Sequence, residues 1–354
     1  MSLWRRANQD RIAVLTIHSV LDEDALDDFR PMRKYLELAK FRENLEFLQQ
    51  RATFLSLSQA LDILEGKAEP VANGIVLTFD DGYMNNFSLA LPVLKALGIP
   101  ATFFLVTSRV ENRRPFWFDR IDFALQKNLS ERFRIRVCGK TVNVEGTSPA
   151  QLRKAMLASF RILMSEGYND RDLDDHVDEM LAPLEALQGQ RLIDYYDEDS
   201  PCAIVTLPVL KQAIKSDLVT IGSHTHHHVR LTTMPDIDAI EELRRSAEWI
   251  TSRTGTTPDF FCYPNGSYDR RTGGLIQAAG YRAALTCVEG LCSPGKQSAM
   301  FLPRINWSVD AGPVELQALT IGAYRDSLSF RSHEHVDESG PPVLKAGIAS
   351  TNID

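Results

Sequence analysis

Two groups of polar residues, far apart in the chain, are of the types that hold a metal ion. Asp80 and Asp81 follow the apolar run 75–79, and His224 and His228 stand four positions apart. A helical turn after Ser223 would bring both imidazoles to one face. One carboxylate and two imidazoles suit a divalent cation such as zinc, and the second carboxylate is left as a base. The pattern indicates a metal-dependent hydrolase.

Each half of this pattern also has a plainer interpretation. An Asp-Gly pair is common in solvated turns, and a histidine pair is more often surface or core than a ligand pair. Four of the eight histidines fall within 224–228, which favours metal binding. Zinc-protease helices place Glu after the first His, but Thr225 stands there, so the base comes from the paired carboxylates. His226 and His227 are interpreted as spectators.

The elements that would position these residues follow a repeating pattern. Short apolar runs alternate with segments of helical period, which predicts an α/β fold whose parallel strands close into a (β/α) barrel. Such barrels carry their chemistry at the carboxyl ends of the strands. Among about eight strand candidates are the runs 12–17, 75–79, 101–106, 218–221, 260–263, 281–286 and 301–305. Helices are predicted within 38–48, 84–97, 207–215 and 237–250.

We predict one barrel domain over residues 1–325. The polar, helix-biased stretch at about 109–208 is interpreted as an insertion between barrel units, and 326–354 as a flexible tail. The insertion begins with the aromatic run 116–118, which either lines a ligand groove or anchors the insertion to the barrel.

Composition excludes several classes of protein. The chain has 354 residues, a formal charge of -8 and dispersed basic residues, which argues against nucleic-acid binding. Five cysteines without a CxxC pair favour reduced thiols. The early apolar run is too short for a signal peptide or a membrane span, so we expect a cytoplasmic protein. Peripheral membrane attachment and the oligomeric state stay open.

Three motifs resemble those of the polysaccharide deacetylase, or NodB-homology, family. They are Thr-Phe-Asp-Asp-Gly at 78–82, Ser-His-Thr at 223–225 followed by His228, and Phe-Cys-Tyr-Pro-Asn-Gly-Ser-Tyr at 261–268. The resemblance lies on both sides of the insertion and implies a distorted (β/α) barrel of the NodB type. It also implies that Asp81, His224 and His228 bind the metal, that Asp80 is the general base, and that a backbone N–H near Asn265 helps to hold the oxyanion.

The third motif departs from the family pattern, because Cys262 replaces the usual Arg. Another residue must then orient Asp80. Arg304, on a late predicted strand, is the candidate by charge and place. The alternative is that Arg304 is an ordinary surface or salt-bridging residue.

The family's last motif supplies a general-acid His, and no such His occurs near 301–307. The segment Leu-Thr-Ile-His-Ser-Val at 15–20 resembles the Tyr-His-x-Val segment of circularly permuted deacetylases, with Ile17 in place of Tyr. This predicts His18 as the general acid, the alternative being a structural histidine.

The resemblance predicts removal of N-acetyl groups from amino sugars of a polysaccharide or of its lipid- or nucleotide-linked precursor, with release of acetate. Zinc is the expected ion, and the same ligands accept iron, cobalt or nickel. Two alternatives remain: deacylation or deformylation of another small amide, and a metal-free carbohydrate-binding barrel, which the two departures would favour. Phosphoryl chemistry at a magnesium site is disfavoured because imidazoles suit softer ions.

Overall fold

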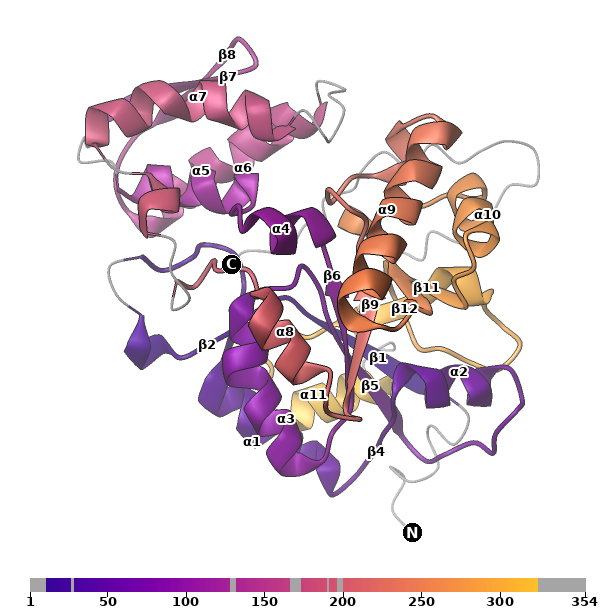
Figure 1. The fold of residues 1–354 in the computed structure, drawn as a ribbon. Helices are drawn as coiled ribbons and strands as arrows, with labels where there is room; N and C mark the ends of the chain where they lie inside the picture. The colour runs from indigo at the N-terminus through magenta and orange to yellow at the C-terminus, as the bar shows by residue number, and fades with distance from the viewer. Residues whose placement is uncertain are drawn as a thin grey trace.

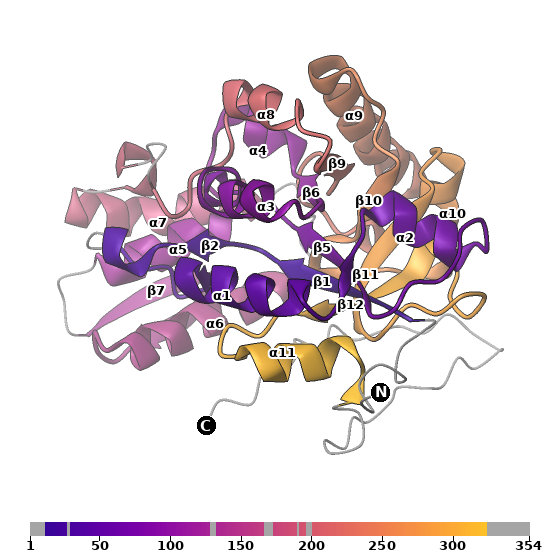
Figure 2. The same cartoon turned by 90° about the horizontal axis from the view of Figure 1, so that it is seen from below.

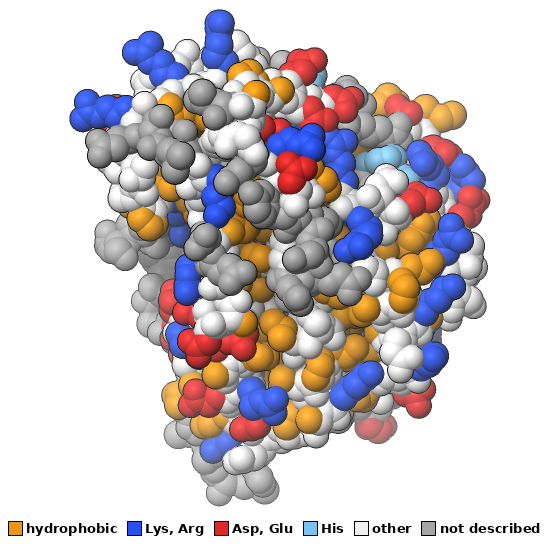
Figure 3. All heavy atoms as spheres, turned by 60° about the vertical axis from the view of Figure 1, so that its left-hand side comes forward, with side chains coloured by type: hydrophobic (Ala, Val, Ile, Leu, Met, Phe, Trp, Pro, Cys, Tyr) orange, Lys and Arg blue, Asp and Glu red, His pale blue; other side chains and the backbone are white. Residues whose placement is uncertain are grey.

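The structure is a computed structural model and describes residues 11–26, 29–127, 132–165, 173–189, 191–195 and 200–323. The predicted tail, 326–354, lies outside these residues. In the part of the chain described here, no helix is both long enough and apolar enough to cross a membrane. On the face drawn in Figure 3, basic and acidic side chains are interspersed rather than gathered by sign.

A closed ring of seven parallel strands forms the centre of the molecule (Figures 1 and 2), which confirms the predicted distorted (β/α) barrel. The ring order is β1-β12-β11-β10-β9-β6-β5, and β5 pairs back onto β1. The strands are β1 Ile12–Ile17, β5 Gly74–Phe79, β6 Ala101–Leu105, β9 Val219–Ser223, β10 Phe260–Cys262, β11 Ala283–Glu289 and β12 Leu302–Asn306. An eighth strand that the sequence did not predict, β4 Thr53–Phe54, adds beside β5.

The strands at the centre of the ring are largely apolar because both of their faces are covered. Every residue of β1 and β5 is buried. Alternation along β5 places Leu77 and Phe79 in the apolar layer beneath the helices, whereas Val76 belongs to a second cluster with Val14 of β1. Because side chains alternate along a strand, Thr78 lies on the same side as Val76. Asp80, two residues after Thr78, therefore lies on that side at the end of the strand.

Helices surround the ring. They are α1 Leu38–Gln49, α2 Leu57–Leu64, α3 Leu91–Leu97, α4 Thr107–Asn112, α8 Leu207–Ala213, α9 Asp236–Thr254, α10 Arg270–Ala278 and α11 Pro313–Thr320. Most begin or end at recognisable signals: Ser56 and Gln59 form a capping box on α2, and Gly255 ends α9 with φ of 78°. The helix predicted at 84–97 is confirmed, and it contains a π-helical segment, η3 Asn86–Ala90, directly before α3.

Between β6 and β9 the chain builds a separate layer, at the upper left of Figure 1. It contains α5 Trp117–Gln126, the antiparallel hairpin of β7 Phe133–Val137 and β8 Lys140–Val144, α6 Pro149–Ser165 and α7 Leu173–Gln188. These elements share an apolar cluster of their own, which includes Ile121, Val142 and Val177. The sequence predicted a helix-biased insertion here but not the hairpin.

Candidate functional site

Asp81, His224 and His228 meet at the carboxyl end of the ring. Oδ1 of Asp81 lies 3.6 Å from Nε2 of His224 and 3.5 Å from Nε2 of His228. This oxygen is buried and has no hydrogen-bond partner among the described residues. A buried, unpartnered carboxylate oxygen is costly, and a cation held between it and two imidazole nitrogens would remove that cost. The three donors therefore fit a divalent metal ion.

The protonation states of this group follow from burial. Burial and the nearby charge of Asp80 raise the pKa of Asp81 to about 8. Burial lowers the pKa of His224 to about 4 and that of His228 well below its usual value. Without a cation the site thus favours one protonated carboxyl facing two neutral imidazoles. Neutral imidazoles are the form that binds metals, and Asp81 would lose its proton to do so.

The imidazoles converge through a loop, so the helical turn predicted after Ser223 is wrong. Residues 224–230 form neither helix nor strand. Thr225 and His228 adopt left-handed φ values of 64° and 63°, which bend the loop sharply enough to bring the two rings to 5.0 Å. Nδ1 of His224 donates to the carbonyl of Cys262 at 2.8 Å, which leaves Nε2 free to face Asp81.

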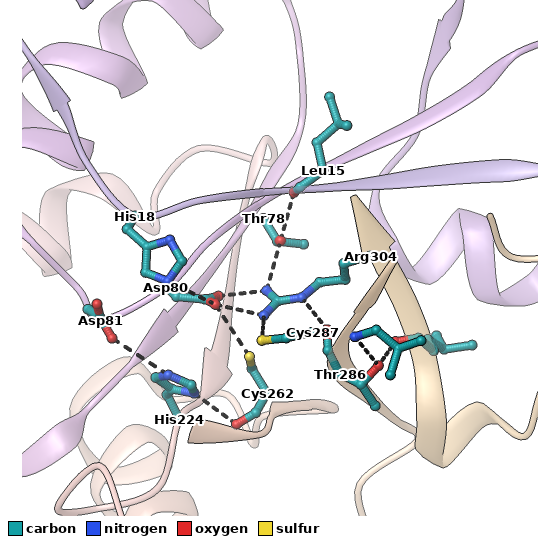
Figure 4. Close-up of polar contacts among 12 residues, drawn as sticks. Leu15, His18, Thr78, Asp80, Asp81, His224, Cys262, Thr286, Cys287 and Arg304 are labelled. Atoms are coloured by element: carbon teal, nitrogen blue, oxygen red, sulfur yellow. Dashed lines mark hydrogen bonds and ion pairs between the residues drawn. The ribbon is translucent and has the colours of Figure 1, made fainter. Parts of the chain in front are cut away.

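Asp80 points away from this group toward Arg304 (Figure 4), and Asp81, with φ of 73°, turns toward His224. Arg304 donates to both oxygens of Asp80, at 2.9 and 2.8 Å, and its Nε donates to the carbonyl of Thr286 at 2.9 Å. Burial opposes ionisation of Asp80, but the charge and hydrogen bonds of Arg304, together with the charges of His224 and His18, outweigh burial and hold the pKa of Asp80 below its usual value. Asp80 therefore stays ionised at neutral pH. Only 1% of the Arg304 side chain is exposed, so it is not a surface residue.

His18 follows β1, which the ring places between β12 and β5. Its Nε2 lies 4.0 Å from Oδ2 of Asp80, and 45% of its side chain is exposed. Two contacts fix the backbone here: the Asp80 N–H donates to the Ile17 carbonyl, and Nδ2 of Asn86 donates to the His18 carbonyl, both at 2.9 Å. Partial burial lowers the pKa of His18, and Asp80 opposes that shift. A titratable group thus faces solvent beside the ionised Asp80.

Comparison with known proteins assigns the family. The polysaccharide deacetylase family matches residues 67–156 and 187–284, more than half of the chain. The chain belongs to this family. YxkH of Bacillus subtilis strain 168, provisionally assigned as a polysaccharide deacetylase, is 24% identical over 131 residues, which is 36% of this chain and 44% of that protein. The chain thus matches less than half the length of this curated relative.

Solved deacetylases share the fold. The Streptococcus pyogenes deacetylase PplD, solved with acetate, has a TM-score of 0.57 at 16% identity, covering 88% of this chain and 99% of that one. IcaB from Ammonifex degensii has a TM-score of 0.57 at 18% identity, covering 88% and 97%. Identities this low show a common architecture and leave the roles of side chains to the local geometry.

In this member of the family, Cys262 takes the place of the usual third-motif Arg and donates its thiol to Oδ2 of Asp80 at 3.5 Å. Donor atoms of Asp80, His224 and Cys262 lie within 4.8 Å of one another, as those of a second metal site would. Arg304, however, engages both oxygens of Asp80, and burial raises the pKa of the Cys262 thiol. This group therefore suits a hydrogen-bonded network around Asp80 rather than a cation.

Asn265 is placed by the turn that follows β10. Asn265 lies in the turn η6 Pro264–Gly266 after β10, with φ of 54° and an exposed side chain. No hydrogen bond or ion pair joins it to the metal group within the described ranges. Its backbone N–H is at the carboxyl end of the strands by its place after β10, and its role stays a prediction.

The aromatic run predicted to line a groove or to anchor the insertion is divided between buried and half-buried positions. Phe116 is fully buried, and its ring lies edge-on to His228 with centroids 5.5 Å apart. Phe118 stacks on Phe116 and lies 6.3 Å from His228. Phe116 thus packs the insertion against a predicted metal ligand, and Trp117 and Phe118 are half-buried.

One buried acid at this site escaped the sequence analysis. The apolar period of the helix predicted at 237–250 includes Ile237 and Ile240, but these side chains are 77% and 48% exposed. The buried face of α9 instead includes Glu242 and Ser246, and Ser246 shares a hydrogen bond with Ser223 at 2.8 Å. The sequence signal for the buried Glu242 was an acid placed at helical spacing among apolar residues. It was missed because the apolar pattern was judged over the whole helix rather than residue by residue.

Proposed function

We propose that the chain is a metal-dependent deacetylase that removes N-acetyl groups from amino sugars of a polysaccharide, or of its lipid- or nucleotide-linked precursor, and releases acetate. Membership of the polysaccharide deacetylase family supports the reaction class. The observation that carries the metal dependence is the buried, unpartnered Oδ1 of Asp81 facing Nε2 of His224 and His228.

Asp81, His224 and His228 would hold the ion, with zinc preferred and iron, cobalt or nickel compatible with the same ligands. When bound, the ion acidifies water and polarises the acetamide carbonyl. The roles of the remaining residues follow from their hydrogen bonds and charges.

Asp80 accepts the proton of the attacking water as the oxygen adds to the carbonyl carbon. Because Arg304 lowers the pKa of Asp80, this carboxylate is a weak base and depends on acidified water as its proton donor. The two hydrogen bonds from Arg304 keep both oxygens of Asp80 oriented. The backbone N–H of Asn265 is assigned to the developing oxyanion.

His18 donates a proton to the departing amine as the C–N bond breaks. Its partial exposure allows it to reach a bound sugar and to regain a proton from solvent. The products are acetate and the free amino sugar. All five cysteines are free, which supports a reducing compartment in which a linked precursor would be the accessible substrate.

The test measures bound metal by elemental analysis and acetate released from an N-acetylglucosamine oligomer. Asp80→Asn should keep its metal and lose acetate release, whereas Asp81→Asn should lose both. A wild-type chain that binds no metal and releases nothing would establish the carbohydrate-binding alternative. Faster release of formate from N-formyl than of acetate from N-acetyl glucosamine would replace the deacetylase assignment with a deformylase.

A further inference from the structure

Glu242 is a fully buried acid of α9 that faces the loop between the two histidine ligands. None of its side chain is exposed. Its Oε2 accepts the backbone N–H groups of His226 and His227, at 3.1 and 3.0 Å. Its Oε1 lies 2.7 Å from Nδ1 of His227. One carboxylate thus joins two consecutive backbone donors and one side chain of the segment that separates His224 from His228.

This loop needs such a partner because it has little regular structure of its own. The residues that flank the two donors, Thr225 and His228, both have left-handed φ values, and such a backbone persists only where its surroundings enforce it. Consecutive N–H groups turned toward one anion form a small anion-binding concavity, and here that anion is a side chain of the protein. These hydrogen bonds offset the cost of burying both the Glu242 carboxylate and the two backbone N–H groups.

The rest of the loop is held by neutral groups. The Ser108 N–H donates to the His226 carbonyl at 2.9 Å, and the Thr107 hydroxyl pairs with Nδ1 of His226 at 2.8 Å. Both contacts come from α4, which follows β6, whereas Glu242 comes from α9, which follows β9. Glu242 supplies the charged contact among these attachments, and it acts on the two residues immediately before His228.

We propose that Glu242 is a positioning residue: it holds the His226 and His227 backbone so that His228 faces Asp81 beside His224. The inference rests on the proposed metal site. Partners behind metal ligands commonly set metal affinity, with losses of about 10–100-fold when they are removed. Glu242 differs from the usual partner of this kind because it orients the ligand through the backbone of the loop rather than through the ligand's second ring nitrogen.

The test measures the zinc dissociation constant by competition with a chelating dye. Glu242→Ala should raise it by about 10–100-fold. Glu242→Gln should raise it less, since an amide oxygen still accepts the two backbone N–H groups. Glu241→Gln, an equal change of charge at the exposed neighbour on α9, is the matched control and should leave the constant unchanged.

Amide hydrogen exchange of His226 and His227 in the metal-free protein gives a second readout. Exchange should be faster in Glu242→Ala than in the wild type and nearly unchanged in Glu241→Gln. A Glu242→Ala protein with the wild-type zinc constant and wild-type exchange would overturn the inference. If Glu242→Ala fails to fold, Glu242→Gln decides the same question: both wild-type readouts overturn the inference, and weakened zinc binding with faster exchange supports it.

Failure of the proposed function would look different. A wild-type chain that binds no zinc would remove the metal site, whereas the exchange measurement, which uses no metal, would still report whether Glu242 orders the loop. Equal zinc affinity in wild type and Glu242→Ala, with the wild type binding tightly, would leave the metal site intact and reject the positioning role alone.

Discussion

Arg304 and Asp80, 224 positions apart in the sequence, form a two-pronged ion pair with N–O distances of 2.9 and 2.8 Å. The pair joins β12 to the end of β5 across the interior of the barrel (Figure 4). In the family, an Arg of the third motif is expected near this acid, and here Cys262 stands in that motif. A guanidinium from another strand therefore reaches the same carboxylate.

Arg304→Met is expected to leave the buried Asp80 carboxylate without its counter-charge. Breaking a buried ion pair by removing one partner costs about 3–5 kcal/mol, so the free energy of unfolding in urea at pH 7 should fall by that amount. Arg244→Met is the matched control, because Arg244 pairs with Glu241 and Glu248 in solvent and should contribute little. Equal losses in the two variants would contradict the role of the buried pair.

The pH profile of the metal-loaded Arg304→Met enzyme should also change. Burial raises the pKa of Asp80, and without Arg304 the main opposing charge is absent. A smaller fraction of Asp80 is then ionised at acidic pH. The acidic limb of kcat/KM should therefore move to higher pH than in the wild type. Acetate release measured from pH 4 to 9 tests this, and an unmoved limb would show that Asp80 does not control it.

Zinc affinity should increase with pH because Asp81 must lose a proton to bind. The pKa of Asp81 is raised to about 8, whereas that of His224 is lowered to about 4, so near neutral pH only the carboxyl titrates. Affinity should grow about tenfold per pH unit below pH 8 and level off above it, with about one proton released per zinc. Calorimetry in buffers of different ionisation enthalpy measures that proton, and its absence at pH 7 would refute the prediction.

The same raised pKa affects the metal-free protein. Asp81 has a folded pKa of about 8 against an unfolded value near 3.9, so between these values the folded state holds the extra proton. The contribution of Asp81 to stability is therefore present at low pH and lost as pH rises toward 8. Saturating zinc should reverse this trend, so the gain in Tm on adding zinc should be larger at pH 8 than at pH 6. A gain independent of pH would argue against titration of Asp81.

His18→Asn is expected to lower kcat for N-acetyl substrates by about 10²–10⁴-fold while bound zinc is retained. The kcat for an aryl acetate should fall much less, because its leaving group departs without a proton. His176→Asn, on α7 outside the site, serves as the control. If amide and aryl ester activities fall together, His18 acts on the fold or on substrate binding rather than as a proton donor.

Gly222→Ala should destabilise the protein just before the first histidine ligand. A Cβ at this position would lie 2.5 Å from the Phe104 ring and 3.1 Å from the Phe260 carbonyl, and overpacking of this kind costs about 1–3 kcal/mol. Gly274→Ala, in α10, is the paired control, because its added Cβ meets no atom within 4 Å and should be neutral or stabilising. Chemical denaturation of both variants gives the comparison.

Local patterns were sufficient for the barrel. Most ring strands are short, largely apolar runs, and this property depends on a few consecutive residues. The sequence motifs likewise indicated Asp80, Asp81, His224 and His228 as candidate site residues, because side-chain chemistry is a property of each residue. The hairpin of β7 and β8 was missed because its alternation is short and its turn at Cys138 and Gly139 requires left-handed φ values that residue type alone did not indicate.

The sequence by itself determined which residues are candidates to bind a cation and to transfer protons, and that alternating strands and helices would bring them to one end of a barrel. Only the tertiary structure decided that a strained loop rather than a helix aims His228, that Glu242 lies beneath that loop, and that Arg304 reaches Asp80. The physical reason is range. Apolar periodicity acts over a few neighbouring residues, whereas these contacts exist only once strands far apart in sequence have closed into a ring.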